Sequence, residues 1–171
     1  MKLSRCTLRP WRVGDEASLV AHANNRRVSR NLKDHFPFPY TPADAAEWIA
    51  HAAAAPGPPQ NFAITVDGVA VGGVGLELGA DIFRRSAEIG YWLGEPYWGR
   101  GIATEVLRAV TEYAFATFDV CRLEAGVFEW NAASMRVLEK AGYTLEGRHR
   151  RSVSKDGQTI DRLVYALVRP E

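Results

Sequence analysis

Cysteine is scarce in this sequence: Cys6 and Cys121 are the two examples in 171 residues. They lie far apart and have no spacing typical of metal ligands, so we expect reduced thiols and no metal site. Charge of one sign is also lacking, because 21 basic and 20 acidic residues leave a net charge of +1 at pH 7. A chain without a strong positive field gives no reason to expect nucleic acid or an anionic membrane as a partner.

Long apolar runs are missing as well. The N-terminal stretch MKLSRCTLRPW lacks the apolar centre of a signal peptide, and no run reaches the ~18 apolar residues of a membrane helix. The remaining composition, 47% apolar and 24% charged, is that of an ordinary globular protein. We therefore expect one cytoplasmic domain over residues 1–171, with no membrane segment.

Apolar periodicity and turn residues predict a mixed α/β chain. The expected elements, in order, are a strand in 6–11, helical segments in 15–32, a loop over 35–42, a helix over 42–55, a hairpin over 61–78, a strand over 86–93, a helix over 101–117, a strand over 121–130, a helix over 131–142 and a hairpin formed by 143–153 and 159–168. The hairpins turn at Asp67-Gly68, a type I′ signal, and at Asp156-Gly157. The order describes an antiparallel meander, a helical crossing to a further strand, and a final hairpin.

Capping residues mark two of the helices. Thr41 as N-cap, with Pro42 in the first turn and Asp44 at N3, opens the helix expected from residue 42. Asn131 is the expected N-cap of the later helix, and Gly142 is expected to close it. Local chemistry therefore predicts where both helices begin and where the second one ends.

A glycine-containing stretch, residues 97–104, runs directly into the helix expected from residue 101. Glycines let the backbone approach a ligand, and the free N–H groups of a helix N-terminus favour an anion. The stretch lacks the Gly-Lys-Ser/Thr ending of a Walker loop, and Thr104 stands where a dinucleotide fingerprint needs its third glycine. Two interpretations stay open, a plain strand-to-helix turn and the pyrophosphate loop of acyl-CoA-dependent N-acetyltransferases, in which Trp98 replaces the usual Gln or Arg.

The stretch AEIGYWLGEPYWGRGIATEVL, residues 87–107, resembles the GNAT superfamily through its RimJ/RimL branch, which acetylates protein N-termini and small amines. Further motifs in the same order extend the resemblance over nearly the whole chain: FPFPYTPADAAEW (36–48), NAASMRVLEKAGYTLEG (131–147) and GQTIDRLVYAL (157–167). The resemblance implies an α+β fold with a single twisted, mostly antiparallel sheet of about seven strands, helices on both faces and a wedge for the cofactor.

The resemblance also implies how acetyl-CoA, the acyl donor, is bound. Backbone N–H groups of residues 99–104 would hold the pyrophosphate, Arg100 would add a charge-assisted contact, and the backbone of 91–93 would pair with the pantetheine amides while its side chains pack in the core. The expected cofactor-binding residues are Tyr91, Trp92, Leu93, Trp98, Gly99, Arg100, Gly101, Ile102, Ala103, Thr104, Asn131 and Ser134.

Two residues are expected to be catalytic. Ser134 matches the serine that the branch places near the thioester sulfur, where a hydroxyl relays a proton to the departing thiolate, although an ordinary first-turn serine is the alternative. Glu88 lies on the strand before the loop, where superfamily members often carry a catalytic glutamate, but a shift of one residue in strand phase would turn it away from the cleft. Leu138 and Val153 stand where other members carry an acid.

The resulting hypothesis is acetyl transfer from acetyl-CoA to a primary amine, with the α-amine of a protein or peptide N-terminus as the expected acceptor. A small-molecule amine acetyltransferase on the same fold is one alternative. A non-catalytic acyl-CoA-binding module is another, because Trp98 departs from the loop pattern and the phase of Glu88 is open. The sequence leaves the acceptor, the size of the acyl group and the choice between monomer and homodimer undecided.

Overall fold

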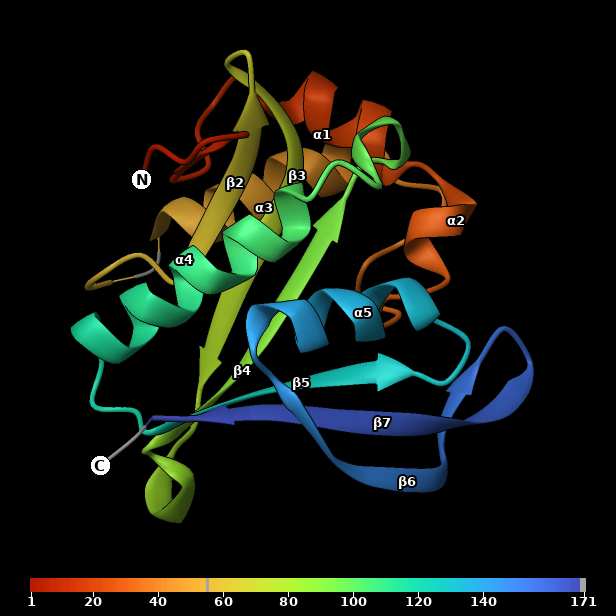
Figure 1. The fold of residues 1–171 in the computed structure, drawn as a ribbon. Coiled ribbons are helices and arrows are strands. Elements are labelled where there is room, and N and C mark those ends of the chain that lie inside the picture. The colour runs from red at the N-terminus through yellow and green to blue at the C-terminus, as the bar shows by residue number, and fades with distance from the viewer. Residues whose placement is uncertain (55, 170–171) are drawn as a thin grey trace. The chain divides into compact units, whose positions relative to one another are not determined.

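The computed structural model describes residues 1–54 and 56–169. Its elements are β1 (Thr7–Arg9), α1 (Glu16–Ala23), α2 (Arg26–Ser29), α3 (Pro42–Ala54), β2 (Asn61–Val66), β3 (Val69–Leu78), η1 (Asp81–Phe83), β4 (Ser86–Leu93), η2 (Glu95–Tyr97), α4 (Ile102–Thr117), β5 (Arg122–Phe128), α5 (Ala132–Ala141), β6 (Thr144–Lys155) and β7 (Gln158–Val168). Here η marks a short 3₁₀ helix. The strands form one seven-stranded sheet in the order β1-β2-β3-β4-β5-β7-β6 (Figure 1).

The sheet is mixed and mostly antiparallel, as the sequence predicts. The pairs β1–β2, β2–β3, β5–β7 and β6–β7 are antiparallel, whereas β4 and β5 pair in parallel, from Ser86 with Arg122 to Glu88 with Glu124. The parallel pair follows from topology, because α4 crosses between the two strands and brings the chain back in the same direction. The expected fold class is confirmed.

Most elements begin and end close to their expected positions. The strand over 86–93 is β4, and the helix expected from residue 42 is seen to Ala54, while its expected last residue, 55, lies outside the described residues. The strand expected over 121–130 is shorter, and η1 was not predicted. Among the described residues, no helix is long and apolar enough to cross a membrane.

Local hydrogen bonds confirm the expected helix caps. The Asp44 N–H donates to Thr41 Oγ1 at 3.3 Å, and the Thr41 N–H donates to Asp44 Oδ2 at 2.7 Å, which is a capping box. Asn131 Oδ1 accepts the N–H of Ser134 at 3.2 Å, and Gly142 ends α5 with a left-handed φ of 98°.

The described residues fall into two compact units, and β3, β4 and α4 each contribute to both. Unit 1 contains the described residues of Met1–Gly75 together with Tyr91–Val106. Unit 2 contains Leu76–Gly90 and the described residues from Leu107 onward. The expected glycine loop therefore belongs to unit 1, whereas Glu88, Asn131 and Ser134 belong to unit 2.

The core of unit 1 is formed by α1, α3 and the strands they cover. Its buried members are Trp11, Leu19, Ala23, Tyr40, Ala45, Ile49, Ala63 and Ala70. Phe36, Trp48 and Trp92 pack against this cluster. The alanines let helix and strand backbones approach each other, and burying the large apolar side chains removes their surface from water, which stabilises the unit.

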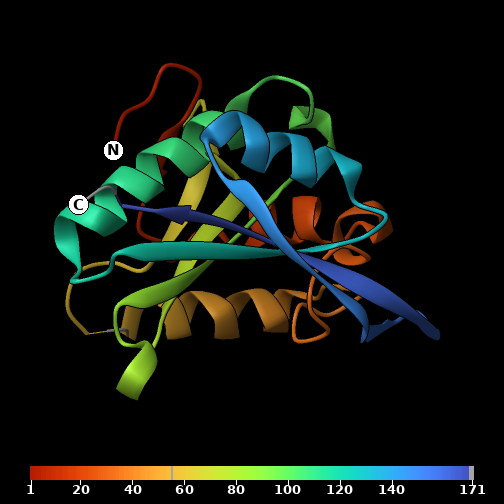
Figure 2. The same ribbon diagram turned by 60° about the horizontal axis from the view of Figure 1, so that its bottom comes forward.

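The core of unit 2 lies between its helices and strands, with α5 and the adjoining part of α4 on the same face of β5 and β7 (Figure 2). Leu107, Leu123 and Leu138 are completely buried there. The hydroxyls of Thr111 and Tyr143 share a buried hydrogen bond of 2.7 Å. Burial raises the pKa of Tyr143 to about 12, so the phenol stays protonated and the buried pair is satisfied without a charge.

Strand β6 is longer and less regular than predicted. It continues to Lys155 and has register shifts between Leu145 and Gly147 and between His149 and Val153. Inside the second shift Arg151 adopts a left-handed φ of 51°, and its N–H donates to Asp161 Oδ1 at 2.7 Å. The carboxylate of Asp161 thus compensates for strand hydrogen bonds that the bulge interrupts.

Candidate functional site

The last residues of β4 are held very close to β3 in unit 1. A Cβ added at Gly72 would lie 2.5 Å from the carbonyl oxygen of Trp92, and the Gly94 N–H donates to the Val71 carbonyl at 2.7 Å. The Trp92 ring packs against Phe36, with ring centroids 5.4 Å apart. The side chain of Trp92 is therefore partly buried against the core of unit 1, and the backbone around it is fixed in place by β3.

Trp98 fastens the loop that follows β4. Its indole N–H donates to the Leu93 carbonyl at 2.6 Å, so the loop folds back onto the strand that precedes it. The Arg27 guanidinium carbon lies 5.6 Å from the centre of the Trp98 ring, which is a cation–π contact. This bridge between loop and strand had no signal in the sequence, and the expected role of Trp98 in cofactor binding stays a prediction.

The helical corner between α1 and α2 supports η2, which leads into the loop. Glu95 accepts a hydrogen bond from Asn25 Nδ2 at 2.8 Å and forms an ion pair with Arg27. The His22 and Tyr97 rings form a T-shaped contact with their centroids 5.4 Å apart. Burial lowers the pKa of His22, so the contact is made by a neutral imidazole at neutral pH.

The glycine loop has the geometry of an anion-binding turn. Gly99 and Gly101 have φ values of +74° and +76°, which side chains rarely adopt, and a Cβ at Gly99 would meet no atom within 4 Å. The Glu105 N–H donates to the Gly101 carbonyl at 3.2 Å and starts the hydrogen-bond ladder of α4. The N–H groups of residues 102–104 precede that bond, so they have no acceptor within the helix and can bind an anion.

Two arginines lie at this loop. The Arg100 guanidinium carbon is 5.2 Å from the centre of the Tyr97 ring, which holds Arg100 at the loop surface. Arg5, from the segment before β1, lies beside Gly101, and a Cβ at Gly101 would be 3.4 Å from Arg5 Nε. Sequence reasoning singled out Arg100 but not Arg5, because Arg5 is distant in sequence and belongs to no motif.

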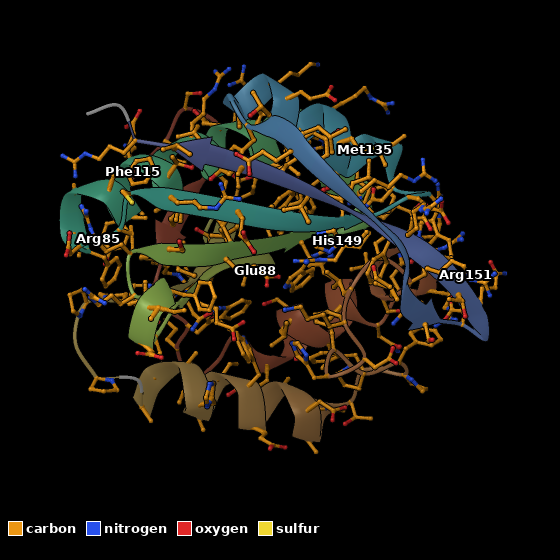
Figure 3. All side chains as sticks on the ribbon, turned by 90° about the horizontal axis from the view of Figure 1, so that it is seen from below. Arg85, Glu88, Phe115, Met135, His149 and Arg151 are labelled. Carbon is orange, nitrogen blue, oxygen red and sulfur yellow. The ribbon has the colours of Figure 1, made fainter. Side chains whose placement is uncertain are left out.

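In unit 2, the structure fixes the phase of Glu88 that the sequence left open. Its neighbours Ala87 and Ile89 are buried, whereas the Glu88 side chain is 29% exposed and lies 3.8 Å from Arg162 Nη2. Figure 3 shows Glu88 on the side of the unit 2 strands away from α5, which carries Met135. Glu88 therefore points to the same side of the sheet as its basic partner Arg162, which sequence reasoning missed.

Arg162 lies directly over the backbone of Gly126. A Cβ at Gly126 would be 2.1 Å from Arg162 Nε and 2.6 Å from its Cζ. Glycine at position 126 therefore leaves the space that the guanidinium occupies. The arrangement places a cation at a defined position beside Glu88.

Asn131 and Ser134 form the first turn of α5. The hydrogen bond from the Ser134 N–H to the Asn131 side chain confirms the structural role expected of Asn131. Leu138, one turn further on, is completely buried, so the position at which other superfamily members carry an acid is part of the core here. The roles of Asn131 in cofactor binding and of Ser134 in proton transfer stay predictions.

The sequence of this chain is similar to those of known N-acetyltransferases. The chain is 45% identical over 87 residues to "Probable N-acetyltransferase YjcK" from Bacillus subtilis, covering 51% of this chain and 48% of that protein. It is 29% identical over 124 residues to the L-amino acid N-acetyltransferase AaaT of Escherichia coli, covering 71% of this chain and 75% of that protein. The match to YjcK thus spans about half the length of that relative.

A solved structure and a family comparison also relate this chain to acetyltransferases. RimJ of Mycobacterium smegmatis, solved with CoA-disulfide, has a TM-score of 0.82 and 26% identity over 96% of this chain and 84% of that chain. Residues 5–144 match the family described as the acetyltransferase (GNAT) domain. With a seven-stranded mixed sheet and a glycine loop entering α4, this chain belongs to the GNAT acetyltransferase family.

Proposed function

We propose that this chain transfers an acetyl group from acetyl-CoA to a primary amine, as a member of the RimJ/RimL branch. The observation that carries the proposal is the loop before α4. It has two left-handed glycines and, at residues 102–104, N–H groups without a helical acceptor. In a GNAT family member, a pyrophosphate is the anion that such a loop would bind.

The residues of unit 1 fit the coenzyme. The N–H groups of 99–104 would donate to the pyrophosphate, and the open space at Gly99 leaves room for phosphate oxygens. Arg100 is held at the loop by Tyr97 and would add a cation. The backbone of residues 91–93, fixed by β3, would pair with the pantetheine amides as an added strand does. RimJ of Mycobacterium smegmatis supports this assignment, because it was solved with CoA-disulfide.

In the proposed reaction the protein polarises the thioester carbonyl and moves protons. When bound, acetyl-CoA supplies an activated thioester carbonyl that a neutral amine can attack. A backbone N–H of residues 91–93 would polarise the carbonyl oxygen. Glu88, directly or through a water molecule, would take the proton released by the amine, and the Ser134 hydroxyl would relay a proton from water to the departing thiolate.

The α-amine of a peptide N-terminus is the acceptor that we propose. An α-amine with a pKa near 7.8 costs ~1 kcal/mol to deprotonate at pH 7, whereas a lysine near 10.4 costs ~4.6 kcal/mol. Because the Glu88 carboxylate is already paired with Arg162, the site is better suited to the α-amine, which costs less free energy to deprotonate. A free amino acid as acceptor is the second candidate, favoured by the similarity of this chain to the L-amino acid N-acetyltransferase AaaT.

Coenzyme binding is tested by calorimetry with acetyl-CoA. The variant Gly101→Val should lose most of its affinity, because a branched side chain would enter the loop. Gly14→Val is the matched control, since Gly14 also has a positive φ, +100°, and no atom within 4 Å of an added Cβ. Equal affinities in Gly101→Val and the wild type would refute the loop assignment.

Catalysis is tested separately by release of free thiol from acetyl-CoA. Two peptides serve as acceptors, one with only its N-terminus free and one with only a lysine free. The N-terminal peptide should have the higher kcat/KM at pH 7. A lysine peptide that reacts faster would refute the proposed acceptor, and saturable CoA binding without turnover on any amine would show a binding module instead.

A further inference from the structure

Arg5 is placed against the glycine loop by contacts within unit 1. A Cβ at Gly101 would lie 3.4 Å from Arg5 Nε and 3.8 Å from its Cδ and Cζ. The guanidinium therefore lies next to the backbone of the loop, although Arg5 precedes β1 and is far from the loop in sequence. The Arg5 side chain is nevertheless 54% exposed, so it is open to a ligand.

A carboxylate in the first turn of α4 holds this segment in place. Glu105 Oε1 accepts the Ser4 N–H at 2.8 Å and the Ser4 hydroxyl at 2.5 Å, and Glu105 Oε2 accepts the Arg5 N–H at 3.1 Å. Burial alone would raise the pKa of Glu105, but the hydrogen bonds from Ser4 and Arg5 lower it. The tether is therefore made by an ionised carboxylate, and it fixes the backbone from which Arg5 extends.

Arg5 also places a positive charge near the carboxylate of Glu105. Glu105 brings a negative charge into the same helical turn that offers its N–H groups to an anion, and this charge would repel a phosphate. Arg5 Nη1 lies 4.0 Å from Glu105 Oε1 and donates to Ser4 Oγ at 3.2 Å. A guanidinium has five N–H donors, including those on Nε and Nη2, so Arg5 can offset the carboxylate and still donate to a ligand.

We propose that Arg5 contacts a phosphate group of coenzyme A, beside the N–H groups of the glycine loop. This inference rests on the proposed function and adds a binding residue that no motif marks. It assigns a ligand role to the segment before β1, with Ser4 and Glu105 as the residues that position Arg5.

The test is calorimetry on the full chain with CoA, 3′-dephospho-CoA and pantetheine. Arg5→Met keeps the apolar stem and removes the charge, and it should weaken CoA binding about tenfold, the loss of one charge-assisted contact. Arg12→Met is the matched control: Arg12 is also an exposed arginine of unit 1, but it faces Asp15 at 3.9 Å, and its loss should change affinity less than ~2-fold. Pantetheine, which lacks the phosphates in question, should bind Arg5→Met and wild type equally.

The outcomes separate the two proposals. A loss that persists with 3′-dephospho-CoA places Arg5 on the pyrophosphate, and a loss seen only with CoA places it on the 3′-phosphate; both support the inference. Unchanged CoA binding in Arg5→Met, or an equal loss for pantetheine, would overturn it while the proposed function stands. A wild-type chain that binds no CoA would overturn the proposed function itself. Should Arg5→Met not fold, Arg5→Lys replaces it, with a smaller expected loss because lysine keeps the charge but not the planar fork.

Discussion

Gly72→Ala adds one methyl group where β3 and the end of β4 approach each other closely. The added Cβ would lie 2.5 Å from the Trp92 carbonyl oxygen and 3.0 Å from the Leu93 Cα. Both are backbone atoms of the neighbouring strand, so no side chain can rotate away to relieve the overlap. The variant can fold only if β3 and the end of β4 move apart.

The expected cost follows from that rigidity. Overpacking in a well-packed interior typically costs about 1–3 kcal/mol, and we take ~2 kcal/mol for a clash with backbone. For a chain of this size each kcal/mol lowers Tm by about 2–4 °C, so Tm should fall by roughly 4–8 °C. CoA affinity should fall as well, because residues 91–93 are the segment proposed to pair with the pantetheine arm.

Thermal unfolding by calorimetry and CoA titration measure the two effects. Gly90→Ala is the matched control on β4, since a Cβ there meets no atom within 4 Å, and it should change stability by less than ~1 kcal/mol. Were Gly72→Ala to melt with the wild type, the close approach of β3 and β4 would be refuted. A destabilised variant with unchanged CoA affinity would refute the role given to the strand end.

Three further predictions concern the N-cap of α5, the hydrogen bond of Trp98 and the pH dependence of stability. Asn131→Ala should lower the free energy of unfolding by ~1 kcal/mol, whereas Ser134→Ala should leave it nearly unchanged and lower turnover; equal Tm losses and equal kinetics would contradict this division. Trp98→Phe removes the donor to Leu93 and should cost ~0.5–1.5 kcal/mol and weaken CoA binding, measured by melting and titration. Because burial lowers the folded-state pKa of His22, the unfolded chain binds its proton first, and stability should fall as pH drops below the unfolded value of 6.5. Melting His22→Gln across the same pH range should give a flatter profile, and a profile as steep as the wild type would refute the assignment.

Features determined by neighbouring residues were predictable from the sequence. Thr41 and Asp44 are three residues apart and cap each other, and Asp67 and Gly68 both adopt the positive φ of the expected turn, 50° and 81°. Their hydrogen bonds and backbone angles depend on a few adjacent residues. The GNAT resemblance placed the sheet and the glycine loop, because its motifs occur in the right order.

Contacts between distant residues were not predictable in this way. Arg5 lies beside Gly101, and Arg162 beside Glu88, and in each pair the partner is chosen by strand register and helix placement. The link from Trp98 to the Leu93 carbonyl is close in sequence, but it depends on the path of the loop. Periodicity predicts on which face of a helix or strand a polar side chain lies. It does not predict which of several possible partners that side chain contacts.

Gly126 and Arg162 cannot vary independently. A side chain at 126 would occupy the volume of the guanidinium, so its effect depends on what stands at 162. Gly126→Ala would mainly displace Arg162 from its position beside Glu88, whereas in a chain that already carries Arg162→Ala the same methyl group would meet little resistance. The two positions should therefore show strong epistasis, and substitutions at either one are to be interpreted only with the other in view.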